Sequence, residues 1–198
     1  MTIFYRLGQK LYINITNACP CACIFCIRNF SDSVGDAESL WLEREPTIDE
    51  IQSAFESRQD LGQIDEIVFC GYGEPMERAD DVIEICKMIK NALPNMPIRI
   101  NTNGLVWLID SAFNISQLSL VDSVSVSLNA DDADEYIRVT NPRFGLSAYD
   151  AMLEFVKAAK QYTKVTLTVV DVLTPERIKN CNLLAEKLAL PLVVRSIM

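Results

Sequence analysis

Short apolar runs alternate with helix-forming segments along this sequence, and that alternation limits the folds that the chain can adopt. Six runs rich in β-branched residues predict strands, at residues 11–16, 67–71, 98–101, 124–129, 165–170 and 192–197. Strands that alternate with helices predict βα units, which build a parallel sheet with right-handed crossovers. No linker or internal repeat divides the sequence, so we expect one α/β domain over residues 1–198.

Five helices are predicted between these strands. The capping box formed by residues 47–50, Thr-Ile-Asp-Glu, marks the start of the first, and Thr174 followed by Pro175 marks the start of the last. Apolar residues at helical spacing predict three more, from Val82 to Leu93, more weakly near 109–118, and over 148–162. This pattern leaves open whether the sheet stays open or curls into part of a barrel.

Catalytic and binding residues are expected at the carboxyl ends of the parallel strands in either arrangement. A cluster of cysteines follows the first of these ends at once, and the longest connection, residues 29–46, comes next. Long loops at such an edge often act as lids. Trp41 and Leu42 would then cap the opening, although a tryptophan there is also typical of a plain hydrophobic anchor.

The charge and the hydropathy of the sequence argue against nucleic-acid binding over a broad surface and against a membrane protein. The chain has 18 Lys and Arg against 27 Asp and Glu, a net charge of −9, which repels a polyanion over most of the surface. We therefore expect no broad nucleic-acid surface, while a local basic pocket stays open. The sequence has no apolar run long enough for a membrane span and no signal-peptide pattern, so we expect a soluble, cytoplasmic protein without membrane contact.

Four of the seven cysteines lie within eight positions: Cys19, Cys21, Cys23 and Cys26. In a reducing compartment such clustering favours a metal site over disulfides, and the absence of histidine leaves thiolates and carboxylates as ligands. In a helix-like winding, positions i, i+4 and i+7 share one side. Cys19, Cys23 and Cys26 would then hold an iron–sulfur cluster and leave its fourth iron without a protein ligand.

Two alternatives stay open at this point. In an extended loop, Cys19, Cys21 and Cys23 would face together, because side chains alternate along an extended chain. All four thiols could also form a zinc knuckle and make the protein a zinc-stabilised binding module. A four-cysteine zinc site usually takes two CxxC-like pairs from separate segments, and the sequence contains no second pair.

The pattern Cys19-x-x-x-Cys23-x-Phe25-Cys26 resembles the signature of the radical S-adenosylmethionine (SAM) superfamily. Residues 71–75, Gly-Tyr-Gly-Glu-Pro, resemble the GGEP segment that binds the SAM amino group in that superfamily, with Tyr72 in place of a glycine. The resemblance implies that Cys19, Cys23 and Cys26 hold a 4Fe-4S cluster. It implies SAM contacts for Phe25, Gly71, Tyr72, Gly73, Glu74 and Pro75.

Weaker matches follow at the ends of later strands. Asn101 and Asn103, then Ser127 and Asn129, resemble positions that bind the SAM carboxylate and ribose hydroxyls, although polar residues there also serve as caps and turns. The adenine-binding pattern GxIxGxxE is not present on the fifth predicted strand. Adenine contacts are therefore left to the backbone and Val170.

A closer resemblance covers nearly the whole chain. Residues 11–29, 40–47 and 125–136, together with Asn-Pro-Arg-Phe-Gly at 141–145, are similar to the small TatD-nuclease-associated radical SAM proteins. The likeness implies a partial six-stranded (βα)6 radical SAM barrel. It supplies no reaction.

The superfamily resemblance implies an oxidoreductase-type reaction. SAM would occupy the fourth iron, and an electron from a donor such as flavodoxin or ferredoxin would cleave it to a 5′-deoxyadenosyl radical. That radical would take a hydrogen atom from an unidentified small-molecule or nucleoside-like substrate. An alternative is an activating enzyme that generates a radical on a protein partner.

Arginines near the expected active edge are candidates for substrate contacts. An arginine at a strand end can clamp a carboxylate or phosphate, and Arg28 and Arg195 are the preferred candidates, ahead of Arg99 and Arg143. Trp41 is the third tentative substrate residue. The scattered thiols are predicted to lie in the core, as free cysteines often do: Cys70, Cys86 and Cys181.

Overall fold

The computed structural model describes residues 1–196 and contains one mixed sheet whose strand order follows the sequence. Strands β2 to β7 pair in parallel, whereas β1 pairs with β2 in an antiparallel hairpin. The strands are β1 (Phe4–Leu7), β2 (Lys10–Ile13), β3 (Glu66–Phe69), β4 (Ile98–Thr102), β5 (Ser123–Ser127), β6 (Lys164–Val170) and β7 (Leu192–Arg195). The predicted α/β sheet with parallel strands is confirmed.

The sequence analysis missed two of the regular elements, helix α4 (Ala133–Thr140) and strand β1. The four residues of β1 precede a two-residue turn in which Gly8 has φ 61°, a left-handed conformation that glycine adopts without strain. So short a strand carries little periodicity, and its pairing depends on the turn. The predicted strand at 192–197 ends at Arg195, and Ile197 lies outside the described residues.

Helices connect the parallel strands, and both predicted capping signals are confirmed. Thr47 and Glu50 form a reciprocal capping box, and Thr174 accepts a hydrogen bond from the Arg177 N–H. The weak helix predicted near 109–118 was misplaced. A short helical turn ends at Ile109, and a 3-10 helix spans Ile115–Leu120. The helices are α1 (Ile48–Glu56), α2 (Ala79–Ala92), α3 (Val106–Ile109), α4 (Ala133–Thr140), α5 (Ser147–Ala159) and α6 (Pro175–Leu188).

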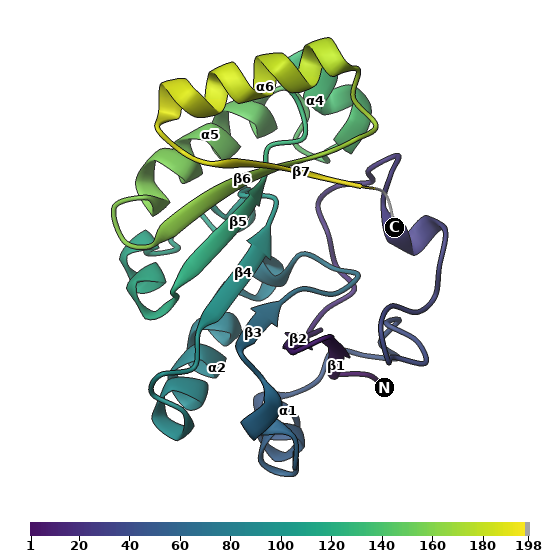
Figure 1. Ribbon diagram of the computed structural model, residues 1–198, viewed down its shortest axis with the longest axis vertical. Coiled ribbons are helices and arrows are strands. Elements are labelled where there is room, and N and C mark those ends of the chain that lie inside the picture. The colour runs from purple at the N-terminus through teal and green to yellow at the C-terminus, as the bar shows by residue number, and fades with distance from the viewer. Residues whose placement is uncertain (197–198) are drawn as a thin grey trace.

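The two faces of the sheet differ in chemistry. The apolar residues of the strands point toward the helices and form the main core with them, and this core includes the buried thiols of Cys86 and Cys181 (Figure 1). The opposite face, here called the helix-free face, carries mostly polar side chains. Cys70 lies next to Asn101 on this face and is absent from the core, so its predicted core position was wrong. An apolar run of residues does not reveal which of its members faces the helices.

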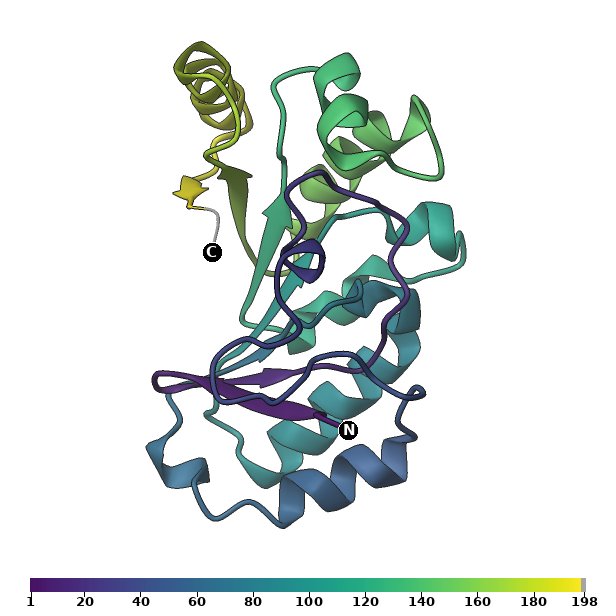
Figure 2. The same ribbon diagram turned by 90° about the vertical axis from the view of Figure 1, so that its right-hand side faces the viewer.

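Part of the helix-free face is covered by the segment that follows β2. Figure 2 looks onto this segment, residues 14–46, which runs in front of the sheet, while β6 and β7 lie beside it. The carboxyl end of β2 leads directly into this cover, so the cysteines sit where the βα geometry places ligands. In residues 1–196, no helix is both long and apolar enough to span a membrane.

Candidate active site around the cysteine loop

Residues 14–26, the cysteine loop, are fixed by main-chain hydrogen bonds to two distant segments. The Glu74 N–H, after β3, donates to the Ala18 carbonyl at 2.8 Å. At the end of α4, the carbonyls of Val139 and Thr140 accept from Ile24 and Ala22, both at 3.0 Å. The loop is therefore shaped by contacts that join the beginning, middle and later parts of the chain.

Arg28 holds the same loop from inside. Its Nη2 donates to the Cys21 carbonyl at 3.1 Å, and its Nη1 lies 3.5 Å from the carbonyls of Asn17 and Tyr72. A guanidinium directed at three carbonyls orders the backbone of the loop, and it also places a positive charge beside the thiols.

The thiols of the loop differ in their ionisation. A hydrogen bond from Cys21 lowers the pKa of Cys19 to about 7, with the charge of Arg28 adding to the effect against the cost of burial. The pKa of Cys21 is raised, first by its hydrogen bond to Cys19 and then by its contact with Cys23 and by burial. Burial also raises the pKa of Cys26. Cys21 is thus the protonated donor, and the Cys19 thiol that accepts from it ionises more readily.

Gly73 explains why the second motif needs a small residue where β3 meets the cysteine loop. A Cβ atom at Gly73 would overlap the main-chain carbonyl oxygens of Thr16 and Ala18. The backbone there can move little, because the Glu74 N–H is bonded to Ala18. A glycine is therefore required for the two motifs to come into contact.

Glu74 is the buried acid of this site, with 5% of its surface exposed. Its carboxylate accepts the Asn103 N–H at 2.7 Å and the Met76 N–H at 3.1 Å, so it joins the ends of β3 and β4. Burial, followed by the nearby Cys19, raises the pKa of Glu74 to about 8 against these hydrogen bonds. A cationic group bound beside it would favour the ionised form.

Tyr72 anchors the segment of residues 29–46, here called the covering loop. Its hydroxyl donates to the Ser31 carbonyl, its ring packs with Leu40, and Trp41 meets it edge-on at 5.1 Å between ring centroids. The Trp41 Nε1 donates to Asp32 within the loop at 3.2 Å. The tyrosine in place of the usual glycine thus has a packing role of its own.

The remaining predicted site residues are distributed along the strand ends. The Asn103 Nδ2 lies 3.9 Å from the Cys21 sulfur, which brings β4 to the cysteine loop, and Pro75 opens the 3-10 turn after Glu74. Asn129 has φ 56° and is buried. Gly71 lies against the cysteine loop, because a Cβ atom there would overlap the Asn14 side chain. Phe25 is on the loop itself, and the other predicted residues lie farther along the sheet: Asn101, Ser127, Val170 and Arg195.

The donor set suits a multi-iron cluster. Cys19, Cys23 and Cys26 are half-buried thiols on one loop, and soft thiolates are the usual ligands of iron–sulfur clusters. No three ligating side chains in residues 1–196 converge as they would on a single metal ion. Each thiolate of a cluster binds a different iron, so a cluster does not require such convergence.

Several residues that shape the site were not singled out from the sequence. Arg78 donates to the Ile15 and Pro46 carbonyls at 2.7 and 2.9 Å and ties both ends of the cover to the sheet. The end of α4 supports the cysteine loop, and Cys21 forms an isolated bridge with Pro142. No local signal identifies these contacts, because each partner is far away in sequence.

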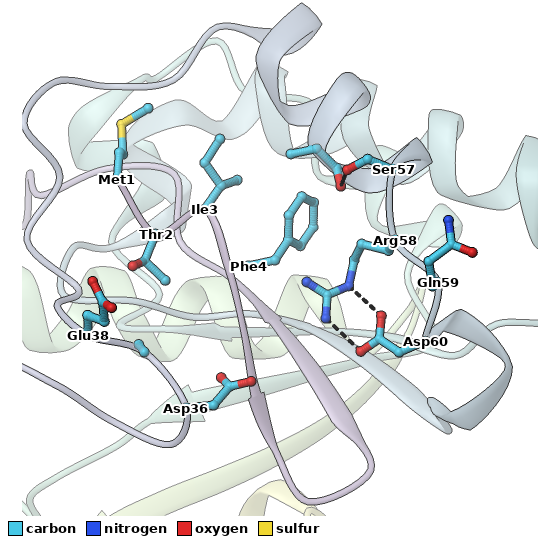
Figure 3. A pocket seen from close by; sticks show the side chains of 12 residues that line it. Met1, Thr2, Ile3, Phe4, Asp36, Glu38, Ser57, Arg58, Gln59 and Asp60 are labelled. Carbon is cyan, nitrogen blue, oxygen red and sulfur yellow. Dashed lines mark hydrogen bonds and ion pairs between the residues drawn. The ribbon is translucent and has the colours of Figure 1, made fainter.

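A separate hollow lies between the start of β1 and the end of α1, away from the cysteine loop (Figure 3). Two of its charged groups pair with each other: Arg58 and Asp60 lie 2.6 Å apart, and Arg58 stands over the Phe4 ring at 5.8 Å. Asp36 accepts the Arg6 N–H at 2.6 Å. None of the predicted site residues lines this hollow.

Comparison with known proteins agrees with this geometry. A family model described as the radical SAM superfamily matches residues 13–184. The chain is 27% identical over 172 residues to a probable dual-specificity RNA methyltransferase RlmN of Thermoanaerobacter sp. (strain X514), covering 84% of this chain and 45% of that protein. It is 30% identical over 155 residues to a probable GTP 3′,8-cyclase of Methanocella arvoryzae, covering 78% and 44%. The chain thus spans less than half the length of these relatives.

Among solved structures, the chain resembles TYW1 with a lysine–pyruvate adduct bound, at a TM-score of 0.62. The match covers 96% of this chain and 65% of the other, with 17% sequence identity. At this identity the likeness concerns the fold, and it agrees with a partial βα barrel.

Proposed function

Because the chain belongs to the radical SAM superfamily, we propose that it is an enzyme whose Cys19, Cys23 and Cys26 hold a 4Fe-4S cluster with SAM at the fourth iron. The observation that carries the proposal is the cysteine loop itself. Its three half-buried thiols, one with a lowered pKa, are held against the Gly73 segment where only glycine fits. When bound, cluster and SAM supply a 5′-deoxyadenosyl radical that takes a hydrogen atom from a substrate.

The chain's own residues bind and orient SAM in this proposal. Glu74 accepts the SAM ammonium, since a carboxylate offers about four lone-pair sites and the N–H groups of Met76 and Asn103 and the Thr102 side chain use three. Asn103, beside Glu74 and Cys21, is suited to the amino-acid end of SAM. The other proposed contacts are Phe25, Gly71, Tyr72 and Pro75 near the cluster, Asn101, Ser127 and Asn129 at strand ends, and Val170 at the adenine.

Substrate contacts are proposed for Arg28, Trp41 and Arg195. Arg28 stands beside the thiols while ordering the loop, and Trp41 lies at the exposed rim of the covering loop. The covering loop excludes water from the reacting centre, which protects a radical from side reactions. A small-molecule substrate and a flavodoxin or ferredoxin as electron donor complete the proposal, with residues 1–198 as a single domain of a cytoplasmic protein. Membership of the TatD-associated subgroup is proposed on the sequence likeness at 40–47 and 141–145.

Two matched cysteine variants test this function. Cys23→Ala removes a proposed ligand, so we expect loss of iron and sulfide after anaerobic reconstitution and loss of 5′-deoxyadenosine formation with dithionite. Cys21→Ala removes the donor to Cys19 and the contacts with Cys23 and Asn103, but no proposed ligand, so we expect it to keep the cluster and to cleave SAM. Iron loss in Cys21→Ala, or a colourless wild-type protein that binds zinc, would contradict the three-ligand assignment.

A further inference from the structure

The strands of this acidic protein are basic. In a chain with a net charge of −9, the seven strands contain one acidic residue, Glu66. They contain five basic residues, which are Arg6, Lys10, Arg99, Lys164 and Arg195. The surplus of acidic residues therefore lies in helices and loops, and the sheet presents a local positive field.

The strand registers place most of this charge on the helix-free face. Arg99 is in register with Val68 on one side and Ser123 on the other, and Arg195 is in register with Val170. Arg195 reaches across the sheet, because its Nη2 donates to the Ser125 hydroxyl at 2.9 Å. Both guanidinium groups therefore lie on the face that the helices do not cover.

The two arginines differ in what they bind. Arg99 donates from all three of its nitrogens: its Nε and Nη2 donate to Glu66 at 3.0 and 3.1 Å, and its Nη1 donates to Asn101 at 2.6 Å. Arg195 takes part in no ion pair within residues 1–196, and Ser125 is its one side-chain partner there. A guanidinium has five N–H donors, so most of those of Arg195 are available to a ligand.

The surroundings of Arg195 favour the binding of an anion to its guanidinium. The side chain is half-buried, and desolvation lowers its pKa, as does the nearby charge of Arg99. A guanidinium stays charged under such conditions, and a partly buried charge without a counter-charge is unfavourable. An anion that binds in fork geometry would supply both the charge and the missing acceptors.

We propose that Arg195, aimed by Ser125, is the binding residue for an anionic group, a carboxylate or a phosphate, on the substrate of this enzyme. Its place on β7 puts the anion across the sheet from the cysteine loop, so the uncharged part of the substrate lies between the two. Arg99 is bonded to Glu66, so it adds positive electrostatic potential at this site without contacting the anion. The inference deepens the proposed function and depends on it only for calling the ligand a substrate.

Arginine-selective labelling with phenylglyoxal tests the proposal in the wild-type protein. Mass spectrometry should find Arg195 labelled and Arg99 unlabelled, because the donors of Arg99 are engaged. Inorganic phosphate or benzoate, at about ten times its dissociation constant, should slow labelling of Arg195 roughly tenfold. The effective probe distinguishes phosphate from carboxylate. Unlabelled Arg195, or labelling that neither anion slows, would overturn the proposal.

Two variants and a control give a second measurement. The probe that protects Arg195 should raise the melting temperature of wild-type protein, and Arg195→Met should abolish the rise while Arg195→Lys retains part of it. Arg138→Met, which removes an exposed arginine on α4, should leave the rise unchanged. Neither readout requires iron. SAM cleavage without anion binding would refute this inference alone, and anion binding without SAM cleavage would refute the proposed function.

Discussion

The two halves of the helix-free face are built differently. Beside β1 to β3, the face is closed by a small apolar cluster of Tyr5, Leu40 and Tyr72, each at most 3% exposed. Beside β5 to β7, the corresponding positions are polar or partly exposed, and Val193 is 47% exposed. The helix-free face is thus sealed beside β1 to β3 and accessible beside β5 to β7.

This difference separates the tasks of the two halves. The sealed half contains the cysteine loop and the tight contact of Gly73, where a cofactor needs fixed geometry and little water. The accessible half carries Thr166 and Arg195, which leaves polar groups available to a ligand that enters and leaves, and the proposed SAM contact at Ser127 borders it. The variants below change one half at a time, beginning with the largest expected effect.

Gly73→Ala should be the most damaging change to the sealed half. The added Cβ would overlap two backbone oxygens, so we expect a loss of at least about 4 kcal/mol in unfolding free energy, or failure to fold. Gly62→Ala is a matched control, because nothing lies within 4 Å of its Cβ position. Urea unfolding of both variants is the measurement, and equal midpoints would contradict the tight contact.

Glu74→Gln should change how stability depends on pH. The folded state raises the pKa of Glu74 to about 8, so it holds a proton that the unfolded chain releases above its ordinary value of 4.5. Wild-type stability should therefore be greatest below that value and decrease as the pH rises through 8, by up to about 4 kcal/mol. Urea unfolding of cluster-free protein from pH 5 to pH 9 should show a smaller decrease for Glu74→Gln. Parallel curves would show that Glu74 ionises normally.

Tyr72→Phe should loosen the covering loop with a moderate effect. The variant loses the buried hydroxyl bond to the Ser31 carbonyl, at a cost of about 1 kcal/mol, while the ring contacts with Leu40 and Trp41 remain. We expect faster proteolytic cleavage within residues 29–46. Mass spectrometry of the fragments over time measures the cleavage rate. Tyr162→Phe, at a 41% exposed tyrosine, should leave the cleavage rate unchanged.

Ser125→Ala should have the smallest effect, confined to the accessible half. It removes one hydrogen bond to Arg195, and we expect a change in stability within about 1 kcal/mol. The cysteine loop makes no contact with Ser125 among the hydrogen bonds of residues 1–196, so iron content should match wild type. A loss of iron would show that the two halves are coupled.

Local signals in the sequence predicted local structure well. The capping box at Thr47, the cap at Thr174 and the parallel order of the strands were all confirmed, because each depends on neighbouring residues or on simple alternation. Cysteine spacing and the Gly73 segment indicated the family for the same reason.

Long-range features could not be predicted in the same way. The support of Ala22 by Thr140 joins residues far apart in the chain. The difference between Arg99 and Arg195 depends on whether an acid lies within reach on the adjacent strand, as Glu66 does two residues before Val68, the register partner of Arg99. The position of Cys70 on the helix-free face depends on a one-residue alternation that an apolar run conceals.

The anchoring of the cysteine loop at the end of α4 has a consequence for biosynthesis. The carbonyls that hold Ala22 and Ile24 belong to Thr140 and Val139, and the Arg143 N–H donates to the Pro20 carbonyl at 2.8 Å. While the ribosome has released only the first hundred residues, these partners do not yet exist outside the exit tunnel. The cysteine loop can therefore take the shape described here only after residues 139–143 have left the exit tunnel.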